Sequence, residues 1–170
     1  MKKLNLKAKI FLFLASISGI LWVGSYMTRL MLAYQIFEGV DFTLRPYVNG
    51  QNLQAIFIIL NSSVILTTLL YAAFILFFGL FLLTSKLSLK KNGWLFIICL
   101  IIIITLPLEA YLISIDYKIY LLSVSGAFNP SDVLSLYIKR FKVLSSFPVI
   151  EILSYFAILF FGIFQPLKKD

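Results

Sequence analysis

Four long apolar runs, each bounded by charged or turn-forming residues, divide the chain. A helix needs about 20 apolar residues to cross the hydrocarbon core of a bilayer. The runs therefore predict membrane-spanning helices over about 10–34, 53–84, 93–115 and 147–164. The second run is far longer than a span requires, so we expect it to tilt or to project from the membrane. The pattern predicts an all-α integral membrane protein, a four-helix transmembrane bundle that forms a single domain over 1–170.

The first apolar run begins like a secretory signal peptide. Lysines precede the stretch FLFLASISG, and together they have the charged and apolar regions of such a signal. The run does not end after a signal-length core but continues through Trp22 to Leu32. We therefore expect it to be retained as an uncleaved span.

A shorter segment, about 131–146, has the pattern of an amphipathic helix before the fourth span. Asn129 suits the N-cap, Pro130 the first helical position, and Asp132 the first turn. At the angular spacing of a helix, Ser131, Asp132, Ser135, Lys139, Lys142 and Ser146 share one narrow face, and Val133, Leu134, Leu136, Tyr137, Phe141, Leu144 and Phe147 cover the rest. We expect this helix to lie on the membrane or on the bundle.

Arg140 interrupts the apolar arc of that helix. The first interpretation is that its long side chain bends back to the lipid headgroups. The alternative is an ion pair with a carboxylate of the bundle.

The charged residues sort into two groups when the chain is cut at the four runs. The N-terminus, the connection around Lys90 and the C-terminus hold nine bases and one acid, which are Lys2, Lys3, Lys7, Lys9, Lys86, Lys90, Lys91, Lys168, Lys169 and Asp170. The other side holds six bases and six acids, which are Arg29, Arg45, Lys118, Lys139, Arg140, Lys142, Glu38, Asp41, Glu109, Asp116, Asp132 and Glu151. Cytoplasmic loops carry the excess of Lys and Arg, so both termini are predicted to be cytoplasmic and the amphipathic helix extracytoplasmic. The lysine-rich start favours a bacterial inner membrane.

Composition narrows the chemistry. The chain is 61% hydrophobic and 13% charged, which is typical of a membrane protein. Its bases flank apolar spans, so its expected partners are anionic lipid headgroups and not nucleic acid. There is no His and a single Cys, Cys99. These features predict no metal site, no cofactor and no catalytic residue, and no phosphate-binding loop or other enzyme motif is recognisable.

One polar residue on each span is predicted to lie in the outer leaflet. Counting along each helix at about 1.5 Å per residue gives a candidate intramembrane cluster of Arg29, Asn61, Glu109 and Glu151. Ionisable groups facing lipid are costly, so they should turn inward and find partners. Asp116, Arg140 and Tyr155 are the further candidate partners.

Three interpretations of this cluster remain open: a structural clasp that sets helix register, an outward-facing pocket for a polar lipid head, quinone or small ion, or groups that simply sit at the interface. The sequence favours the clasp. It therefore predicts a non-catalytic accessory or assembly subunit of a larger membrane complex, in contact with other membrane subunits. The alternatives are a transporter or channel subunit or a lipid- or quinone-binding protein that uses the cluster, and, more weakly, an enzyme acting on lipid.

Overall fold

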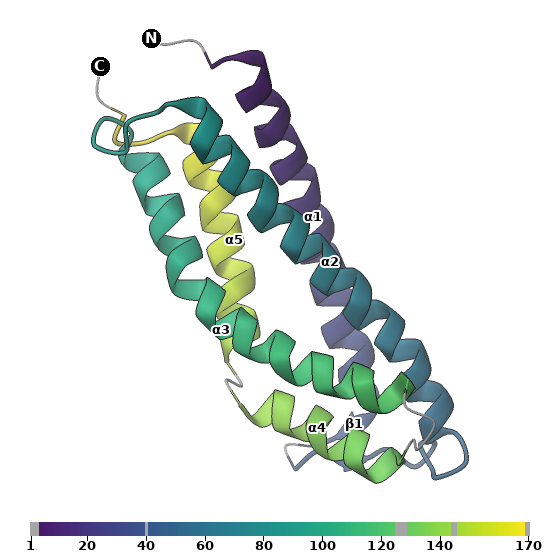
Figure 1. The fold of residues 1–170 in the computed structure, drawn as a ribbon. Helices are drawn as coiled ribbons and strands as arrows, with labels where there is room; N and C mark the ends of the chain where they lie inside the picture. Colours follow the sequence, from purple (N-terminus) through teal and green to yellow (C-terminus); the bar gives the residue numbers. More distant parts are fainter. Residues whose placement is uncertain (1–3, 40, 125–128, 144–145, 169–170) are drawn as a thin grey trace. The chain divides into compact units, whose positions relative to one another are not determined.

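The computed structural model describes residues 4–39, 41–124, 129–143 and 146–168. Within these residues the chain forms five helices and one two-stranded antiparallel ribbon (Figure 1). The elements in order are α1 (Leu6–Tyr34), β1 (Phe37–Glu38), β2 (Thr43–Leu44), α2 (Leu53–Ser85), α3 (Gly93–Val124), α4 (Pro130–Lys142) and α5 (Phe147–Phe164). Among the described residues, α1, α2, α3 and α5 are long and apolar enough to cross a membrane, as the four apolar runs predicted.

Three helix ends differ from the prediction by several residues. The first span was predicted to begin near residue 10, but α1 begins at Leu6. The third helix was predicted to end near residue 115, but α3 continues to Val124. Asp116, the first residue after the predicted span, is 1% exposed, and Ile119 one turn later is fully buried. Because the Asp116 side chain is buried within α3, the inward face of this helix continues beyond it.

The amphipathic helix was predicted to run to residue 146 but ends at Lys142, because Val143 adopts an extended backbone. Residues 144 and 145, including Leu144 of the predicted apolar face, lie outside the described residues. The predicted start is confirmed. The side chain of Asn129 accepts a hydrogen bond from the backbone N–H of Ser131, and a proline occupies the first turn.

The described residues divide into two compact units. Unit 1 comprises Met1–Val23, Leu70–Ala110 and Ser146–Asp170, and unit 2 comprises Gly24–Leu69 and Tyr111–Ser145. Each of α1, α2 and α3 therefore contributes one part to each unit, whereas α5 belongs to unit 1 and α4 to unit 2. The sequence had no composition shift that indicated this division.

One end of unit 1 brings together three segments that are far apart in the chain (Figure 1). Asn5 caps α1 by accepting a hydrogen bond from the backbone N–H of Ala8 at 2.7 Å, and its amide donates to the Thr84 carbonyl at 3.0 Å. Asn92 forms a β-bridge with Lys168. The start of α1 is thus bonded to the end of α2, and the α2–α3 connection is bonded to the segment after α5.

Unit 2 has an apolar core beneath the ribbon and α4. Its buried members are Ala33, Ile36, Phe37, Val48, Leu53, Phe57, Leu60, Ile115, Ile119, Val133, Tyr137 and Phe141. The ring of Tyr137 stacks on Phe57 with centroids 5.0 Å apart, and Phe141 packs edge-on against Phe37 at 5.7 Å. Val133, Tyr137 and Phe141 recur at four-residue spacing, so the apolar face of α4 is buried against this core as an amphipathic helix requires.

Candidate functional site

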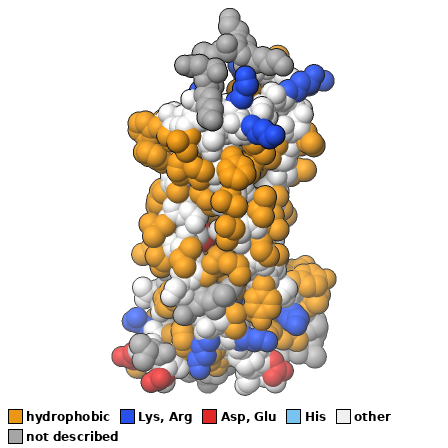
Figure 2. All heavy atoms as spheres, turned by 90° about the vertical axis from the view of Figure 1, so that its left-hand side faces the viewer, with side chains coloured by type: hydrophobic (Ala, Val, Ile, Leu, Met, Phe, Trp, Pro, Cys, Tyr) orange, Lys and Arg blue, Asp and Glu red, His pale blue; other side chains and the backbone are white. Residues whose placement is uncertain are grey.

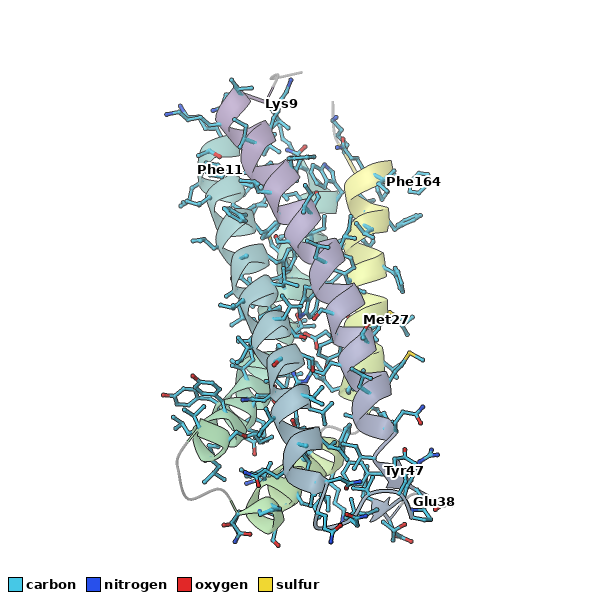
Figure 3. All side chains as sticks on the ribbon, turned by 90° about the vertical axis from the view of Figure 1, so that its right-hand side faces the viewer. Lys9, Phe11, Met27, Glu38, Tyr47 and Phe164 are labelled. Carbon is cyan, nitrogen blue, oxygen red and sulfur yellow. The ribbon has the colours of Figure 1, made fainter. Side chains whose placement is uncertain are left out.

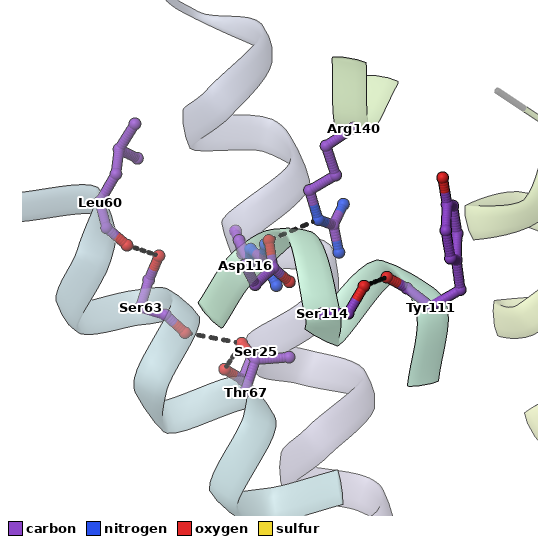
Figure 4. A network of polar contacts seen from close by, with 9 residues as sticks. Ser25, Leu60, Ser63, Thr67, Tyr111, Ser114, Asp116 and Arg140 are labelled. Carbon is purple, nitrogen blue, oxygen red and sulfur yellow. Dashed lines mark hydrogen bonds and ion pairs between the residues drawn. The ribbon is translucent and has the colours of Figure 1, made fainter. Parts of the chain in front are cut away.

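A buried cluster of three charged side chains joins three helices of unit 2. Arg29 of α1 donates from Nη2 to Asp116 Oδ1 of α3 at 2.5 Å. Arg140 of α4 donates from Nε to the same oxygen at 2.7 Å (Figure 4). Asp116 is 1% exposed and each arginine is 5% exposed. We call these three residues the Arg–Asp–Arg cluster.

The electrostatics of the cluster centre on one carboxylate, which two guanidinium groups share. Buried charges are tolerated only when they are paired and hydrogen-bonded. The two arginines come from helices α1 and α4, which are far apart in sequence, and both are anchored on one residue of α3. The arrangement fixes the register of the three helices.

The interaction of Arg140 corrects the first interpretation of that residue. Its side chain was expected to extend to lipid headgroups, and this is wrong, because it is buried and paired with Asp116. The alternative, an ion pair with a carboxylate, is confirmed. The signal was present in the sequence, since a cation in the middle of an apolar arc needs a buried partner.

A second polar contact joins α1 to α2 in unit 2. The hydroxyls of Ser25 and Thr67 lie 2.7 Å apart, and Thr67 also donates to the carbonyl of Ser63 at 2.8 Å (Figure 4). Small hydroxyl residues let two helices approach closely and bond across the interface. Asn61 lies on the same helix, is 7% exposed, and thus faces inward.

The two predicted glutamates lie in unit 1. Glu109 on α3 is 1% exposed and Glu151 on α5 is 2% exposed. Both therefore face the interior, as expected for carboxylates on spanning helices. Tyr155, one turn after Glu151, is also buried, so these two residues share the inward face of α5.

Aromatic rings surround this part of unit 1. Trp22 lies 5.0 Å from Tyr71 and 5.9 Å from Tyr155, measured between ring centroids. These rings and Glu151 line a cavity of about 10 Å³. That volume is close to the minimum for one water molecule, so it does not accommodate an organic substrate.

The structure therefore divides the predicted outer-leaflet cluster. Arg29 and Asn61 belong to unit 2, whereas Glu109 and Glu151 belong to unit 1. The ion pairs of Arg29 and Arg140 go to Asp116, which the sequence had suggested only as a further partner. All seven candidate residues, those named here and Tyr155, are buried, as the cost of polar groups in lipid requires.

Tyr137 packs beside the Arg–Asp–Arg cluster and is expected to make stability depend on pH. Burial raises the pKa of its phenol from 10 to about 12; Asp116 also raises the pKa, while Arg29 and Arg140 lower it. Because the folded-state pKa exceeds the unfolded one, this contribution to stability is complete below pH 10 and is lost as the pH rises from 10 to about 12.

We expect the free energy of unfolding to fall through that window by at most about 1.4 kcal/mol per pH unit. The Tyr137→Phe variant should lose this part of the pH dependence. Its cost at neutral pH should be small, because the Tyr137 hydroxyl has no hydrogen-bond partner among the described residues. Denaturant titrations of both proteins in detergent, at neutral and alkaline pH, measure the difference. Parallel pH profiles for the two proteins would contradict the assignment to Tyr137.

Comparison with known proteins yields no match: no family model, no curated protein and no solved structure matches this chain.

Proposed function

We propose that this protein is a non-catalytic accessory or assembly subunit of a larger complex in the cell (inner) membrane. The observation that carries the proposal is the outer face of α5. Only 17% of the most apolar window of this helix is buried. Its exposed large apolar side chains are Val149, Ile150, Leu153, Phe156, Phe160, Ile163 and Phe164.

These side chains follow the helix from end to end, away from the buried Glu151 and Tyr155. In Figure 3 the side chain of Phe164 points outward from α5, and its ring centroid lies 4.9 Å from that of Phe160. Figure 2 shows many hydrophobic side chains on the face of the protein that it presents. A continuous apolar and aromatic face needs lipid or another protein to cover it. Clustered Phe rings give a neighbouring spanning helix a large surface for packing.

The polar groups of unit 2 support a structural role. Arg29 lies near the end of α1, which begins at Leu6, and Asp116 lies near the end of α3, which begins at Gly93. At about 1.5 Å per residue both are roughly 35 Å along their helices, beyond the roughly 30 Å of a hydrocarbon core. The Arg–Asp–Arg cluster is then a clasp at the outer interface, where it orders α4 before the last span.

The experiment that tests this function is purification of the full chain in mild detergent or native nanodiscs, followed by mass spectrometry of what accompanies it. The proposal expects stoichiometric membrane subunits. Phe156→Ala with Phe160→Ala should release them while the protein stays folded, and Ile58→Ala with Ile59→Ala, exposed on α2, is the matched control. A protein that purifies alone as a monomer, without change in either variant, would contradict the subunit role.

Both termini are proposed to be cytoplasmic. The charge distribution along the chain supports this orientation. The hydrogen bonds from Asn5 to Thr84 and from Gly93 to the Leu167 carbonyl add support, since the first joins the start of α1 to the end of α2 and the second joins the start of α3 to the segment after α5.

The orientation predicts which introduced cysteines react from outside the cell. In a Cys99→Ala background, an impermeant maleimide should label Gln51→Cys in intact cells, and should label Lys90→Cys only after permeabilisation. Both positions are exposed, so accessibility within the fold is matched. Labelling of Lys90→Cys in intact cells would reverse the orientation.

A second candidate function, a transporter or channel subunit, is favoured by the almost complete burial of Glu109 and Glu151 in spanning helices. Ionisable residues inside membranes often mark ion or proton pathways. This candidate expects Glu109→Gln or Glu151→Gln to abolish a flux and leave the amount of protein unchanged. The accessory function expects lower abundance or lost co-purification instead.

A further inference from the structure

Unit 1 contains a large cavity at the end where its three segments meet. Its volume is about 1150 Å³, and its walls come from α1, α2, α3, α5 and the connections between them. Pockets for small molecules usually measure about 300 to 1,000 Å³. The cavity therefore has room for a headgroup together with part of an apolar chain.

Four lysines contribute to the cavity wall: Lys9, Lys86, Lys91 and Lys168. They come from α1, from the α2–α3 connection and from the segment after α5, and all four are exposed. Lys9 lies near the start of α1 in Figure 3. Among the described residues that line the cavity, none is acidic. The lysines thus supply positive charge that the cavity lining itself does not neutralise.

The rest of the wall is largely apolar and aromatic. Phe78, Phe81, Leu95 and Ile98 line it, and each is at most 8% exposed to solvent. Tyr155 and Ile158 of α5 continue this surface. These residues belong to helices that can span a membrane, whereas Lys86, Lys91 and Lys168 lie outside the helices. The cavity therefore has a cationic end outside the helices and an apolar part between them.

We propose that this cavity is a binding site for one anionic phospholipid, with the phosphate at the four lysines and an acyl chain along the aromatic wall. Basic pockets between membrane helices recognise anionic headgroups in this way. A free phosphate or a nucleotide would leave the apolar wall unused, and a zwitterionic lipid would leave the charge of the lysines unbalanced. The site goes beyond the accessory function: it shares Ile163 with the exposed face of α5 but none of the aromatic rings there, so the two proposals are tested at different residues.

Trp94 provides a direct signal for binding. It lines the cavity and is 6% exposed, and the only other tryptophan of the chain, Trp22, does not line it. In a Trp22→Phe background, the full-length protein in detergent is titrated with a short-chain phosphatidylglycerol while Trp94 fluorescence is followed. We expect a saturable change with phosphatidylglycerol. A phosphatidylcholine of the same chain length should bind about tenfold more weakly, because it lacks the net charge that the lysines attract.

Two variants separate the charged and apolar parts of the site. Lys86→Gln with Lys91→Gln should weaken binding about tenfold to thirtyfold. This is the combined effect expected when two lysines near an anionic headgroup lose their charge. The control is Lys118→Gln with Lys139→Gln, two exposed lysines of unit 2, which should leave binding unchanged. Gly162→Leu keeps every charge and adds an apolar side chain to the cavity lining, where an added Cβ meets nothing within 4 Å. It should obstruct the lipid chain without lowering the thermal transition of the protein.

The proposal is overturned if phosphatidylcholine binds as tightly as phosphatidylglycerol, or if the control lysine pair matters as much as Lys86 and Lys91. It is also overturned if inorganic phosphate alone gives the same saturable change, because the occupant is then an ion and not a lipid. Unaltered binding in a folded Gly162→Leu variant would show that the lipid does not enter the cavity.

Discussion

Replacing Asp116 by Asn is expected to destabilise the protein by about 3 to 5 kcal/mol, the range measured when one partner of a buried ion pair is removed. The reason is the charge of the Arg–Asp–Arg cluster. Asp116 accepts from both Arg29 and Arg140, so its loss removes the carboxylate that two buried cations share. Since folded proteins are stable by only about 5 to 15 kcal/mol, the variant should unfold at a much lower temperature or fail to accumulate. Circular dichroism melts and denaturant titrations in detergent measure the loss.

The order of effects within the cluster is a sharper test than the single variant. Arg140→Met should be far milder than Asp116→Asn, because it leaves the Arg29–Asp116 pair in place and keeps an apolar side chain of similar length. Adding Arg140→Met to Asp116→Asn should recover part of the lost stability, since it removes one of the two cations that had faced the carboxylate. Glu38→Gln, at an exposed position of β1, is the control for loss of a carboxylate and should stay within about 0.5 kcal/mol of the parent. If Arg140→Met proved more damaging than Asp116→Asn, the charge argument would be wrong.

Gly19→Ala is expected to destabilise the protein by about 1 to 3 kcal/mol, the usual cost of an extra methyl group in a well-packed interior. A Cβ at this position of α1 would lie 2.7 Å from Tyr155 Oη, 2.8 Å from Tyr155 Cε2 and 3.1 Å from Phe74 Cδ2. Small residues at helix contacts in membranes permit this close approach. The added methyl would push apart α1 and α5 within unit 1. A shift of the melting transition in detergent measures the effect.

Gly79→Ala on α2 is the matched control, because an added Cβ there meets nothing within 4 Å. Alanine is the better helix former, so this variant should be neutral or stabilising by up to about 1 kcal/mol. In a Tyr155→Leu background the cost of Gly19→Ala should shrink, which gives a double-mutant coupling between the two positions. Equal effects of Gly19→Ala and Gly79→Ala would mean that helix propensity and not packing determines the result.

The helices and their approximate ends could be predicted because those signals are local. Each spanning helix is a run of apolar residues, and the start of α4 follows from Asn129 and Pro130. The predictions were wrong where a residue far away in the sequence determines the environment of a local one. The third span was predicted to end just before Asp116, because the two arginines that pair with this carboxylate lie 87 and 24 residues away in the chain. The short β1–β2 ribbon was not predicted at all, since each strand has only two residues and carries no alternating pattern.

The candidate site was predicted in its members but not in its pairing. Hydrophobic surroundings alone indicate that Arg29, Glu109 and Glu151 must turn inward, because an ionised group in hydrocarbon is costly wherever its partner lies. Which carboxylate meets which arginine depends on the rotation and height of each helix at the scale of a single hydrogen bond. Counting residues along a helix does not reach that accuracy.

By itself the sequence determined that the chain has four helices able to span a membrane, that its bases concentrate in the termini and one connection, and that charged residues within its spans must turn inward. These follow from the transfer energies of single side chains, which act without knowledge of the rest of the fold. The tertiary structure alone decided that Asp116 binds both arginines, that Gly19 accepts Tyr155 against its backbone, and that four lysines from three segments line one cavity. Each of these three contacts joins atoms from distant parts of the chain. Such contacts form only when the helices are packed against one another, because they act over short distances.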